Sequence, residues 1–577
     1  MIIFTDLGGV VKMGQFNLID EPWISVIDNT TEEQRLVSMK DLFINAQDYR
    51  CLAGDTETQN FSVLRVLLAV LQTVFSRYDA EGKPYGELKI NDLMQQTSDI
   101  DRDEDEEYYD SYPEAMDNTW KSLWTKKRFS PIVVEYLDCW KERFYLFDKK
   151  FPFYQVPINV IEKSLPEGKS PSVIAGRFLN RTISESGNKI ALFAPRTSQT
   201  KDLMSEAELV RWLITYQNYT GLSDKASLVT GKQKPSKGWI FDIGGLYLEG
   251  NNLFETLMLN YLPYKKASKY WWKKQQPCWE FTGEEVINRL IKGRPIYNLA
   301  ELYTNWSRAV YLNPDMDTNG SIFCSDVKLP SIAHDSDLEP MTIWRRNKTG
   351  DFKDLFTPQK HEPEQAMWRS FGLITLQTSQ DENHRQPEIL QQYKRVKKYS
   401  GNRWIRMHAV SMQDDGNATS WLPVDEIKDS LNLNDIVISD ENPDGWVIRI
   451  NEIVELSKKV VDITYYGLLK DIAEIRNMDP KISNGYISRE KQLMYQRLDQ
   501  PFRKWLESLS PSDKMDDAMK IWKKELRSIV LDQAQSLVKQ SNGRDFIGKE
   551  VNGYVKNIAT VYLSFMGRLK QILGEVD

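Results

Sequence analysis

The feature that most constrains the fold is a series of four long amphipathic segments near the end of the chain. They span residues 449–477, 487–509, 512–540 and 551–574. In each segment apolar residues recur at three- and four-residue steps, which gathers them on one face of a helix. Because four such helices joined by short links can bury their apolar faces against one another, the sequence predicts an up-and-down four-helix bundle over residues 446–577.

The residues ahead of the bundle follow a mixed pattern of strands and helices. Short runs such as FYLF and RWIRMHAV suggest strands, whereas SEAELVRWLITYQNY at 205–219 is typical of an amphipathic helix. Ser205 and Glu208 have the spacing of a capping box at its start. Turn residues near 440–448 mark a linker. We therefore expect an α+β protein, with a large mixed N-terminal domain with irregular loops at 1–445 and the four-helix bundle after it.

The charge balance limits the kinds of partner. The 577 residues include 75 basic and 82 acidic side chains, which gives a net charge of −7. This balance argues against a surface that coats nucleic acid uniformly, but it is compatible with a local basic groove. The most apolar run, residues 61–75, contains Arg65 and Gln72, so it favours a core helix over a membrane span.

Cysteine and histidine spacing gives no sign of a metal centre. The four cysteines are far apart with no CxxC pair, and the four histidines fall outside the usual zinc spacings. We therefore expect reduced thiols, a cytoplasmic location, no bound metal and no cofactor.

No motif of catalysis stands out. TGKQ at 230–233 lacks the upstream glycine and the Ser or Thr of a phosphate-binding loop. The nearest candidates for a metal-dependent nuclease are His334, Asp335 and Asp337 in AHDSD, together with the acidic run at 99–110. The favoured interpretation of both stretches is a solvated polar loop.

Three basic segments with interleaved aromatic residues favour a localised nucleic-acid surface. They are GLSDKASLVTGKQKPSKGWIF at 221–241, YKKASKYWWKK at 264–274 and YKRVKKYSGNRWIR at 393–406. Lysine and arginine neutralise phosphates, and aromatic faces stack on bases or sugars. In the alternative, the aromatic residues belong to the core and the lysines only solvate a surface. The first segment is rich in glycine and serine, so we expect it to be flexible until it meets a ligand.

Several further stretches occur in an order that points to one family. They are FNLIDEPWISV at 16–26, FAPRT at 193–197, GGLYLEGNNLFETLMLNYLP at 244–263, QPCWE at 276–280, LAELYTNWSRAVYL at 299–312 and EPMTIWRR at 339–346. This series resembles CasA, the large subunit of Cascade, the type I-E CRISPR surveillance complex. The resemblance covers nearly the whole chain, and it rests on the order of the motifs more than on any single one.

The resemblance implies a reader of DNA without a catalytic centre. Such a subunit binds double-stranded DNA, recognises the protospacer-adjacent motif largely from the minor groove, and helps open the duplex so that guide RNA pairs with the target strand. The implied partners are the CRISPR RNA, the backbone, small and guide-end-binding subunits, and the helicase–nuclease. A purely structural scaffold subunit is the remaining alternative.

The resemblance and the basic segments together suggest which residues meet DNA. These are Phe193, Pro195, Arg196, Gly221, Ser223, Lys225, Lys232, Lys234, Lys237, Lys328, Gln413 and Asn417.

Each stretch has an expected role. The resemblance places 193–197 near the guide end, 221–227 against the motif duplex, and Lys328 as a minor-groove finger. Residues 231–238 are expected to attract the DNA backbone in general. A strand-separating hairpin is expected near 411–421, with Asp415 and Gly416 forming a tight turn.

Overall fold

The chain folds into two compact units. The structure, a computed structural model, describes residues 16–574 except 87, 102, 105, 181, 183–195, 198–199, 202, 223–225, 264–272, 315–321, 333–338, 351, 377–381, 402 and 552. Unit 1 comprises residues 1–361, 387–400 and 408–428, and unit 2 comprises 362–386, 401–407 and 429–577. Mixed helices and strands ahead of a helical C-terminal region confirm the predicted α+β class.

The core of unit 1 is built around α2 (Glu57–Val74). The helix begins where the Thr56 side chain accepts a hydrogen bond from the Gln59 N–H at 3.2 Å. Nearly all of its side chains are buried, because α4 (Ile132–Cys139), α6 (Glu206–Asn218), α7 (Leu253–Asn260) and α9 (Leu299–Tyr303) pack around it. The expected core helix is therefore confirmed. Among the described residues, no helix combines the length and apolar character needed to cross a bilayer.

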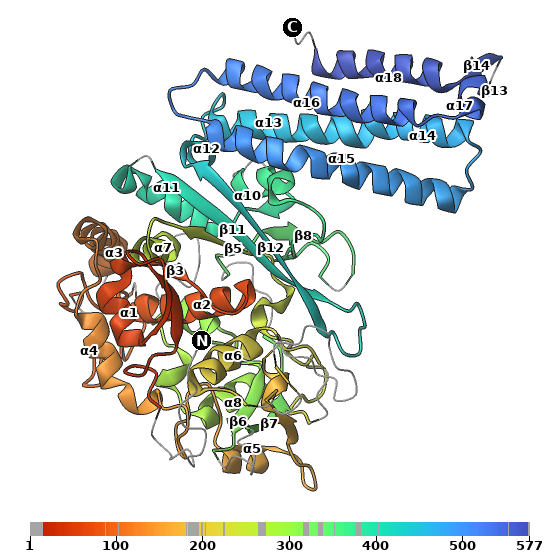
Figure 1. The fold of residues 1–577 in the computed structure, drawn as a ribbon. Coiled ribbons are helices and arrows are strands. Elements are labelled where there is room, and N and C mark those ends of the chain that lie inside the picture. Colours follow the sequence, from red (N-terminus) through yellow and green to blue (C-terminus); the bar gives the residue numbers. More distant parts are fainter. Residues whose placement is uncertain are drawn as a thin grey trace. The chain divides into compact units, whose positions relative to one another are not determined.

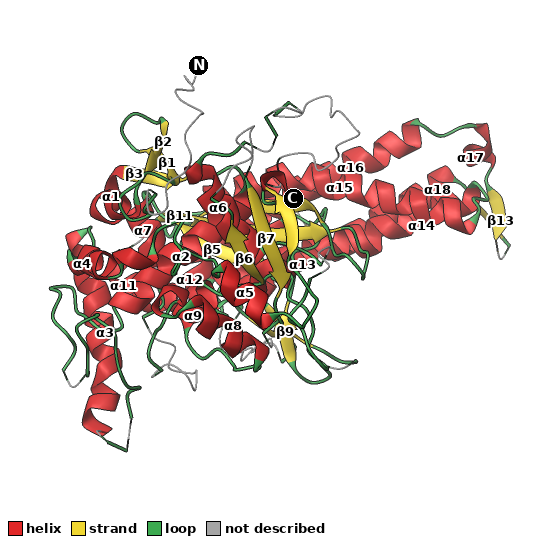
Figure 2. Ribbon diagram, turned by 90° about the horizontal axis from the view of Figure 1, so that it is seen from below, coloured by secondary structure: helices red, strands yellow, loops and turns green. Residues whose placement is uncertain are grey.

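Unit 1 contains several small sheets among its helices (Figure 2). Strand β1 (Ile24–Asp28) pairs antiparallel with β2 (Gln34–Val37) and β3 (Tyr49–Leu52). Strand β7 (Phe323–Lys328) lies between β4 (Ser172–Ala175) and β6 (Arg308–Leu312), antiparallel to both. Strand β8 (Trp344–Arg346) pairs with β9 (Phe356–Pro358). A further sheet has the order β12 (Pro423–Asn434), β11 (Trp404–Asp414), β5 (Gly245–Glu249), and residues 408–428 of its hairpin belong to unit 1.

The other helices of unit 1 complete its surface. They are α1 (Met39–Asn45), α3 (Glu106–Lys126), α5 (Ile158–Ser164), α8 (Gly283–Ile291) and α11 (Glu388–Ser400).

Two buried ion pairs fix α2 and the turn that follows it to distant parts of the chain. Arg65 donates two 2.9 Å hydrogen bonds to Glu339, and Arg77 donates bonds of 2.8 and 3.0 Å to Glu280. All four side chains are at most 1% exposed. Because a buried charge is costly unless it is paired, EPMTIWRR supplies the carboxylate that Arg65 of α2 needs, and QPCWE supplies the one for Arg77, in the turn after the helix.

Unit 2 holds the predicted bundle (Figure 1). Its first helix is α13 (Trp446–Lys459), which continues through a π-helical turn at 460–465 into α14 (Tyr466–Ile475). The others are α15 (Pro480–Ser508), α16 (Met515–Lys539) and α18 (Ile558–Leu573). Contacts of α14 with α15 and α18, and of α16 with α13, α15 and α18, close the four-helix arrangement.

The last predicted helix begins later than expected. The start of the 551–574 segment belongs to a hairpin of β13 (Lys549–Val551) and β14 (Tyr554–Lys556). This hairpin follows α17 (Gly543–Ile547). Gly548 and Gly553 have φ of +74° and +80°, and they allow the chain to turn there. Helix α18 starts only after Asn557, whose side chain accepts from the Thr560 N–H.

Segments upstream of the bundle also pack within unit 2. The Trp368 ring stacks on Phe502 with centroids 4.3 Å apart, and its indole N–H donates to Asp499 at 3.0 Å. Arg503 pairs with Asp429 at 2.9 Å. Helices α10 (Phe371–Thr375) and α12 (Ile436–Ser439) lie in these segments. Unit 2 therefore takes in residues ahead of 446, where the turn residues of the sequence suggest a boundary.

Candidate nucleic-acid interface

The lysine-rich segment is a loop whose two ends are held together. The Thr220 N–H donates to the Lys237 carbonyl at 3.0 Å. The guanidinium of Arg308, on β6, donates to the carbonyl of Gly221 and, at 2.6 Å, to that of Ser236. The Arg308 side chain is fully buried. One buried cation therefore closes the loop at its base, and Ser223 and Lys225 lie outside the described residues.

The far part of this loop is anchored, in contrast to the expected flexibility. Leu228 donates its N–H to the Lys328 carbonyl at 2.9 Å, and Lys328 donates to the Ala226 carbonyl at 3.0 Å. Ser236 donates to Leu329 at 2.9 Å. Residues 226–238 are held because backbone groups at the end of β7 and just after it bond to the segment, which its composition does not reveal. The half-buried Lys328 contributes its backbone here.

The lysines of the segment differ in what surrounds them. Lys232 and Lys234 are exposed. The Lys237 side chain is only 17% exposed, and its ammonium group is 2.8 Å from the Asp242 carboxylate. The same ammonium lies 4.3 Å from the centroid of the Trp421 ring and 5.0 Å from that of Phe241.

The expected hairpin is formed by β11 and β12, but its turn is longer than expected. The loop spans residues 415–422. Asp415 accepts hydrogen bonds from the N–H groups of Asn417 (3.0 Å) and Leu422 (3.1 Å), and Trp421 donates to the Asn417 carbonyl at 2.8 Å. The prediction of a tight turn at Asp415–Gly416 is wrong because the carboxylate of Asp415 organises a wider loop. Gln413 precedes it on β11, half-buried, and Asn417 is exposed in it.

This hairpin loop meets the start of the lysine-rich segment. Leu222 donates its N–H to the Ser420 carbonyl at 2.6 Å. Gly221 has φ of +80°, and a Cβ at this position would lie 2.6 Å from the Trp421 carbonyl oxygen. Only glycine combines that backbone conformation with so close an approach. The structure thus brings Gly221, Lys237 and the loop of Asn417 together through Trp421, which the sequence interpretation missed although it ends the expected hairpin.

Four charged side chains next to the hairpin loop form a network: Lys237, Asp242, Lys360 and Asp414. Lys360 is 3.0 Å from Asp414 and 3.5 Å from Asp242, and Asp242 also pairs with Lys237. Burial would raise the pKa of Asp414, but the hydrogen bond and charge of Lys360, together with the charge of Lys237, outweigh it and hold that pKa below its usual value. Asp414 therefore faces protein cations, whereas the Asp415 carboxylate accepts from the N–H groups of its own loop.

The base of the hairpin is fixed to α2. Glu426 on β12 accepts hydrogen bonds from the Glu57 N–H (3.2 Å) and the Thr58 N–H (3.0 Å), the first amides of that helix. A carboxylate at a helix N-terminus is stabilised by the unpaired amides and the helix dipole. The hairpin therefore starts from a rigid part of unit 1.

Arg196 lies at a second site, the N-terminus of α6, where it pairs with Glu208. Ser205 accepts from the Glu208 N–H at 3.3 Å, as predicted. The Glu208 carboxylate accepts instead from Asn180, at 2.6 Å, and from Arg196, so the second half of the capping box is replaced. Gly221 follows the other end of α6, a helix of about 20 Å. Phe193 and Pro195 lie outside the described residues.

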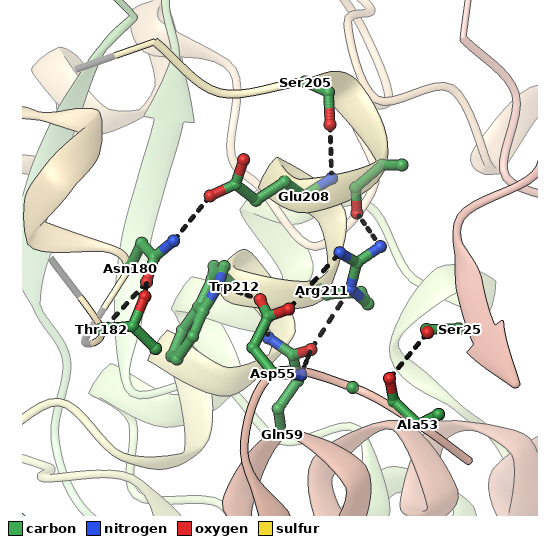
Figure 3. Close-up of polar contacts among 12 residues, drawn as sticks. Ser25, Ala53, Asp55, Gln59, Asn180, Thr182, Ser205, Glu208, Arg211 and Trp212 are labelled. Atoms are coloured by element: carbon green, nitrogen blue, oxygen red, sulfur yellow. Dashed lines mark hydrogen bonds and ion pairs between the residues drawn. The ribbon is translucent and has the colours of Figure 1, made fainter. Parts of the chain in front are cut away.

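Helix α6 itself is tied to the N-terminal part of unit 1. Arg211 donates to the side chain of Gln59 at 3.2 Å and to the Trp23 carbonyl at 2.9 Å, and the Trp212 indole donates to Asp55 at 2.7 Å (Figure 3). Both ends of the helix therefore present their loops from a fixed support.

The other expected nucleic-acid segments are only partly described. Residues 264–272 lie outside the described residues. In 393–406, Tyr393 is fully buried, which favours the core interpretation for that ring, whereas Trp404 is 52% exposed. Within the described ranges, no three His, Cys, Asp or Glu side chains gather as a metal site would require. The nuclease candidates His334, Asp335 and Asp337 are not among the residues described.

Comparisons with known proteins agree on one family. The family model of CRISPR-associated protein Cse1 matches residues 17–533. The curated CRISPR-associated protein CasA/Cse1 of Thermus thermophilus is 26% identical over 371 residues, which span 63% of this chain and 61% of that relative's length.

Solved structures share the fold. Cse1 of Thermobifida fusca is similar over 97% of this chain and 98% of its own, with a TM-score of 0.71 and 22% identity. A chain of a CRISPR RNA-guided surveillance complex is similar over 96% of this chain and 99% of its own, with a TM-score of 0.62 and 15% identity.

Proposed function

The chain belongs to the Cse1 family of CRISPR-associated proteins, and from that premise we propose that it is the non-catalytic large subunit of a CRISPR RNA-guided surveillance complex. In this role it binds double-stranded DNA, recognises the protospacer-adjacent motif and promotes duplex opening and R-loop formation. The observation that carries the proposal is the contact between the Gly221 turn and the hairpin loop 415–422. The exposed Lys232 and Lys234 lie further along the same lysine-rich segment.

The chemistry of this meeting point suits a duplex read from its minor groove. That groove offers a degenerate pattern of donors and acceptors, so it is read by width, by a few polar contacts and by side chains that separate base pairs. We assign the polar contacts to Gln413 and Asn417 and the phosphate contacts to Lys232 and Lys234. Phe193, Pro195, Arg196, Ser223, Lys225 and Lys328 keep their expected places at the DNA as part of this proposal.

The proposed partners follow from the same role. They are the CRISPR RNA, the backbone, small and guide-end-binding subunits, and the helicase–nuclease that the subunit helps recruit in the cytoplasm. One structural relative is itself a chain of a surveillance complex, which supports the assembly. The long helices of unit 2 offer a surface on which other subunits can dock.

Binding by complexes assembled with and without this chain tests the proposal. We expect the complete complex to bind a duplex carrying the correct motif more tightly than one with a scrambled motif, and the complex lacking the chain to lose that difference. Equal affinity of the complete complex for both duplexes would contradict motif reading. Cleavage of DNA with magnesium or manganese that is lost on changing Asp335 and Asp337 would favour the nuclease instead.

The double change Lys232→Ala and Lys234→Ala is expected to weaken DNA binding equally for correct and scrambled motifs. Each lost phosphate contact lowers the slope of log K against log salt by about 0.9, so the slope should fall by about 1.8. Affinity measured at several salt concentrations gives this slope. Lys149→Ala, an exposed lysine outside the segment, is the matched control. An unchanged slope would remove these two lysines from the interface.

A further inference from the structure

The Lys237 side chain is largely buried and paired with a carboxylate, whereas the side chains of Lys232 and Lys234 are exposed. Its ammonium group is bonded to Asp242 at 2.8 Å and lies over the rings of Trp421 and Phe241. A lysine that serves phosphate keeps its ammonium group in water until the ligand arrives, as the exposed Lys232 does. Lys234 is also exposed, and its ammonium lies only at the edge of reach of one ring, 5.8 Å from the centroid of Phe352. The surroundings of Lys237 are those of a structural cation held by a carboxylate and aromatic faces.

Trp421 is held in an unfavourable backbone conformation at this contact. Its φ is +46°, a region that bulky side chains rarely adopt. Such strain persists only where the surroundings enforce it. Here the Trp421 carbonyl closely approaches Gly221, and the Trp421 N–H donates to the Asn417 carbonyl. The Lys237 ammonium lies over the Trp421 ring.

The charge network fixes Lys237 in turn. Asp242 is shared between Lys237 and Lys360, and Lys360 also holds Asp414, the last residue of β11. The four groups carry two charges of each sign, so the cluster is neutral and the ammonium of Lys237 is not repelled from it. The last residue of the strand and the ring of the loop are therefore both tied to the segment that carries Lys237.

We propose that Lys237 and Trp421 form a latch that holds the hairpin loop 415–422 against the turn at Thr220–Leu222 in the free protein, so that Lys237 is a positioning residue and not a contact to phosphate. The latch sets where Asn417 and Gln413 stand before a duplex arrives. Its effect on DNA reading rests on the proposed function, whereas its presence in the free chain does not.

Hydrogen exchange of the free, full-length chain tests the latch directly. In Lys237→Met, which keeps the apolar stem and removes the charge, exchange of the amides of Leu222 and Leu422 is expected to be faster by on the order of tenfold. Trp421→Leu should give a similar increase, the double variant should add little to either, and Lys237→Arg should restore most of the protection. Lys234→Met is the matched control and should leave exchange unchanged. Unchanged exchange in Lys237→Met overturns the latch.

Binding by the assembled complex then separates positioning from phosphate contact. Lys237→Met is expected to reduce the preference for the correct motif several-fold while the salt slope stays as it was, and Lys234→Met is expected to do the opposite. Equal weakening on both duplexes, with the slope lower by about 0.9, would assign Lys237 to phosphate and overturn the positioning role. If the unchanged complex shows no motif preference, the proposed function fails, and hydrogen exchange still decides the latch.

Discussion

Replacing Arg308 by methionine is expected to lower the free energy of unfolding of unit 1 by about 3–5 kcal/mol. The guanidinium is fully buried, 3.8 Å from the equally buried Asp326 carboxylate, and it serves the carbonyls of Gly221, Ser236 and Ser307. Methionine fills similar space but leaves Asp326 without this cation and the Gly221 and Ser236 carbonyls without this donor, whereas the Ser307 carbonyl keeps its bond from the Leu329 N–H. Urea unfolding followed by circular dichroism and tryptophan fluorescence measures the loss.

Two further variants show whether charge is the cause. Arg345→Met removes an exposed arginine on β8, and we expect a change within about 0.5 kcal/mol. Adding Asp326→Asn to Arg308→Met should recover part of the loss, because it removes the unpaired buried charge. A loss below about 1 kcal/mol in Arg308→Met would show that Arg308 does not close the loop.

Gly238→Ala is the second change with a large expected effect, about 2–6 kcal/mol of destabilisation. Gly238 has φ of +101°, and a Cβ there would lie 2.0 Å from the Asn218 carbonyl oxygen. Because the clash is with the backbone at the end of α6, no side-chain movement relieves it. The lysine-rich loop and α6 would have to separate, so thermal unfolding should begin at a clearly lower temperature.

Gly231→Ala provides a matched control in the same loop. Gly231 also has a positive φ, +60°, but a Cβ there would meet nothing within 4 Å. Its cost should be limited to the left-handed backbone, about 1 kcal/mol. Equal destabilisation by the two alanines would show that the approach to Asn218 is not what requires glycine at 238.

The helical parts of the fold are predictable because their signals are local. The apolar repeat that marks 512–540 needs only neighbours three and four residues away, and α16 occupies that range almost completely. The Ser205 cap of α6 is equally local. The start of the last helix is less so, because its prediction depends on the turns at Gly548 and Gly553, whose positive φ the sequence does not display.

The candidate site is predictable only in pieces, since its contacts join residues far apart in the chain. Gly221 and the hairpin near Asn417 are both visible in the sequence, but the carbonyl of Trp421 that brings them together is not. The lysines of 225–237 look alike in the sequence, and only the fold shows that Lys237 has Asp242 and two rings around it. Composition likewise predicts flexibility for 226–238, because it does not show the backbone partners on β7.

The buried pairs of Arg65 and Arg77 also limit when the core can form during synthesis of the chain. Arg65 is 274 residues from Glu339, and Arg77 is 203 residues from Glu280. At the usual speed of translation, roughly 15–55 s therefore pass between the synthesis of Arg65 and that of Glu339. During that time the largely apolar helix α2 carries Arg65, and the turn after it carries Arg77; neither can enter a dry core without its carboxylate. The core around α2 is therefore expected to be completed only after residue 339 has been synthesised.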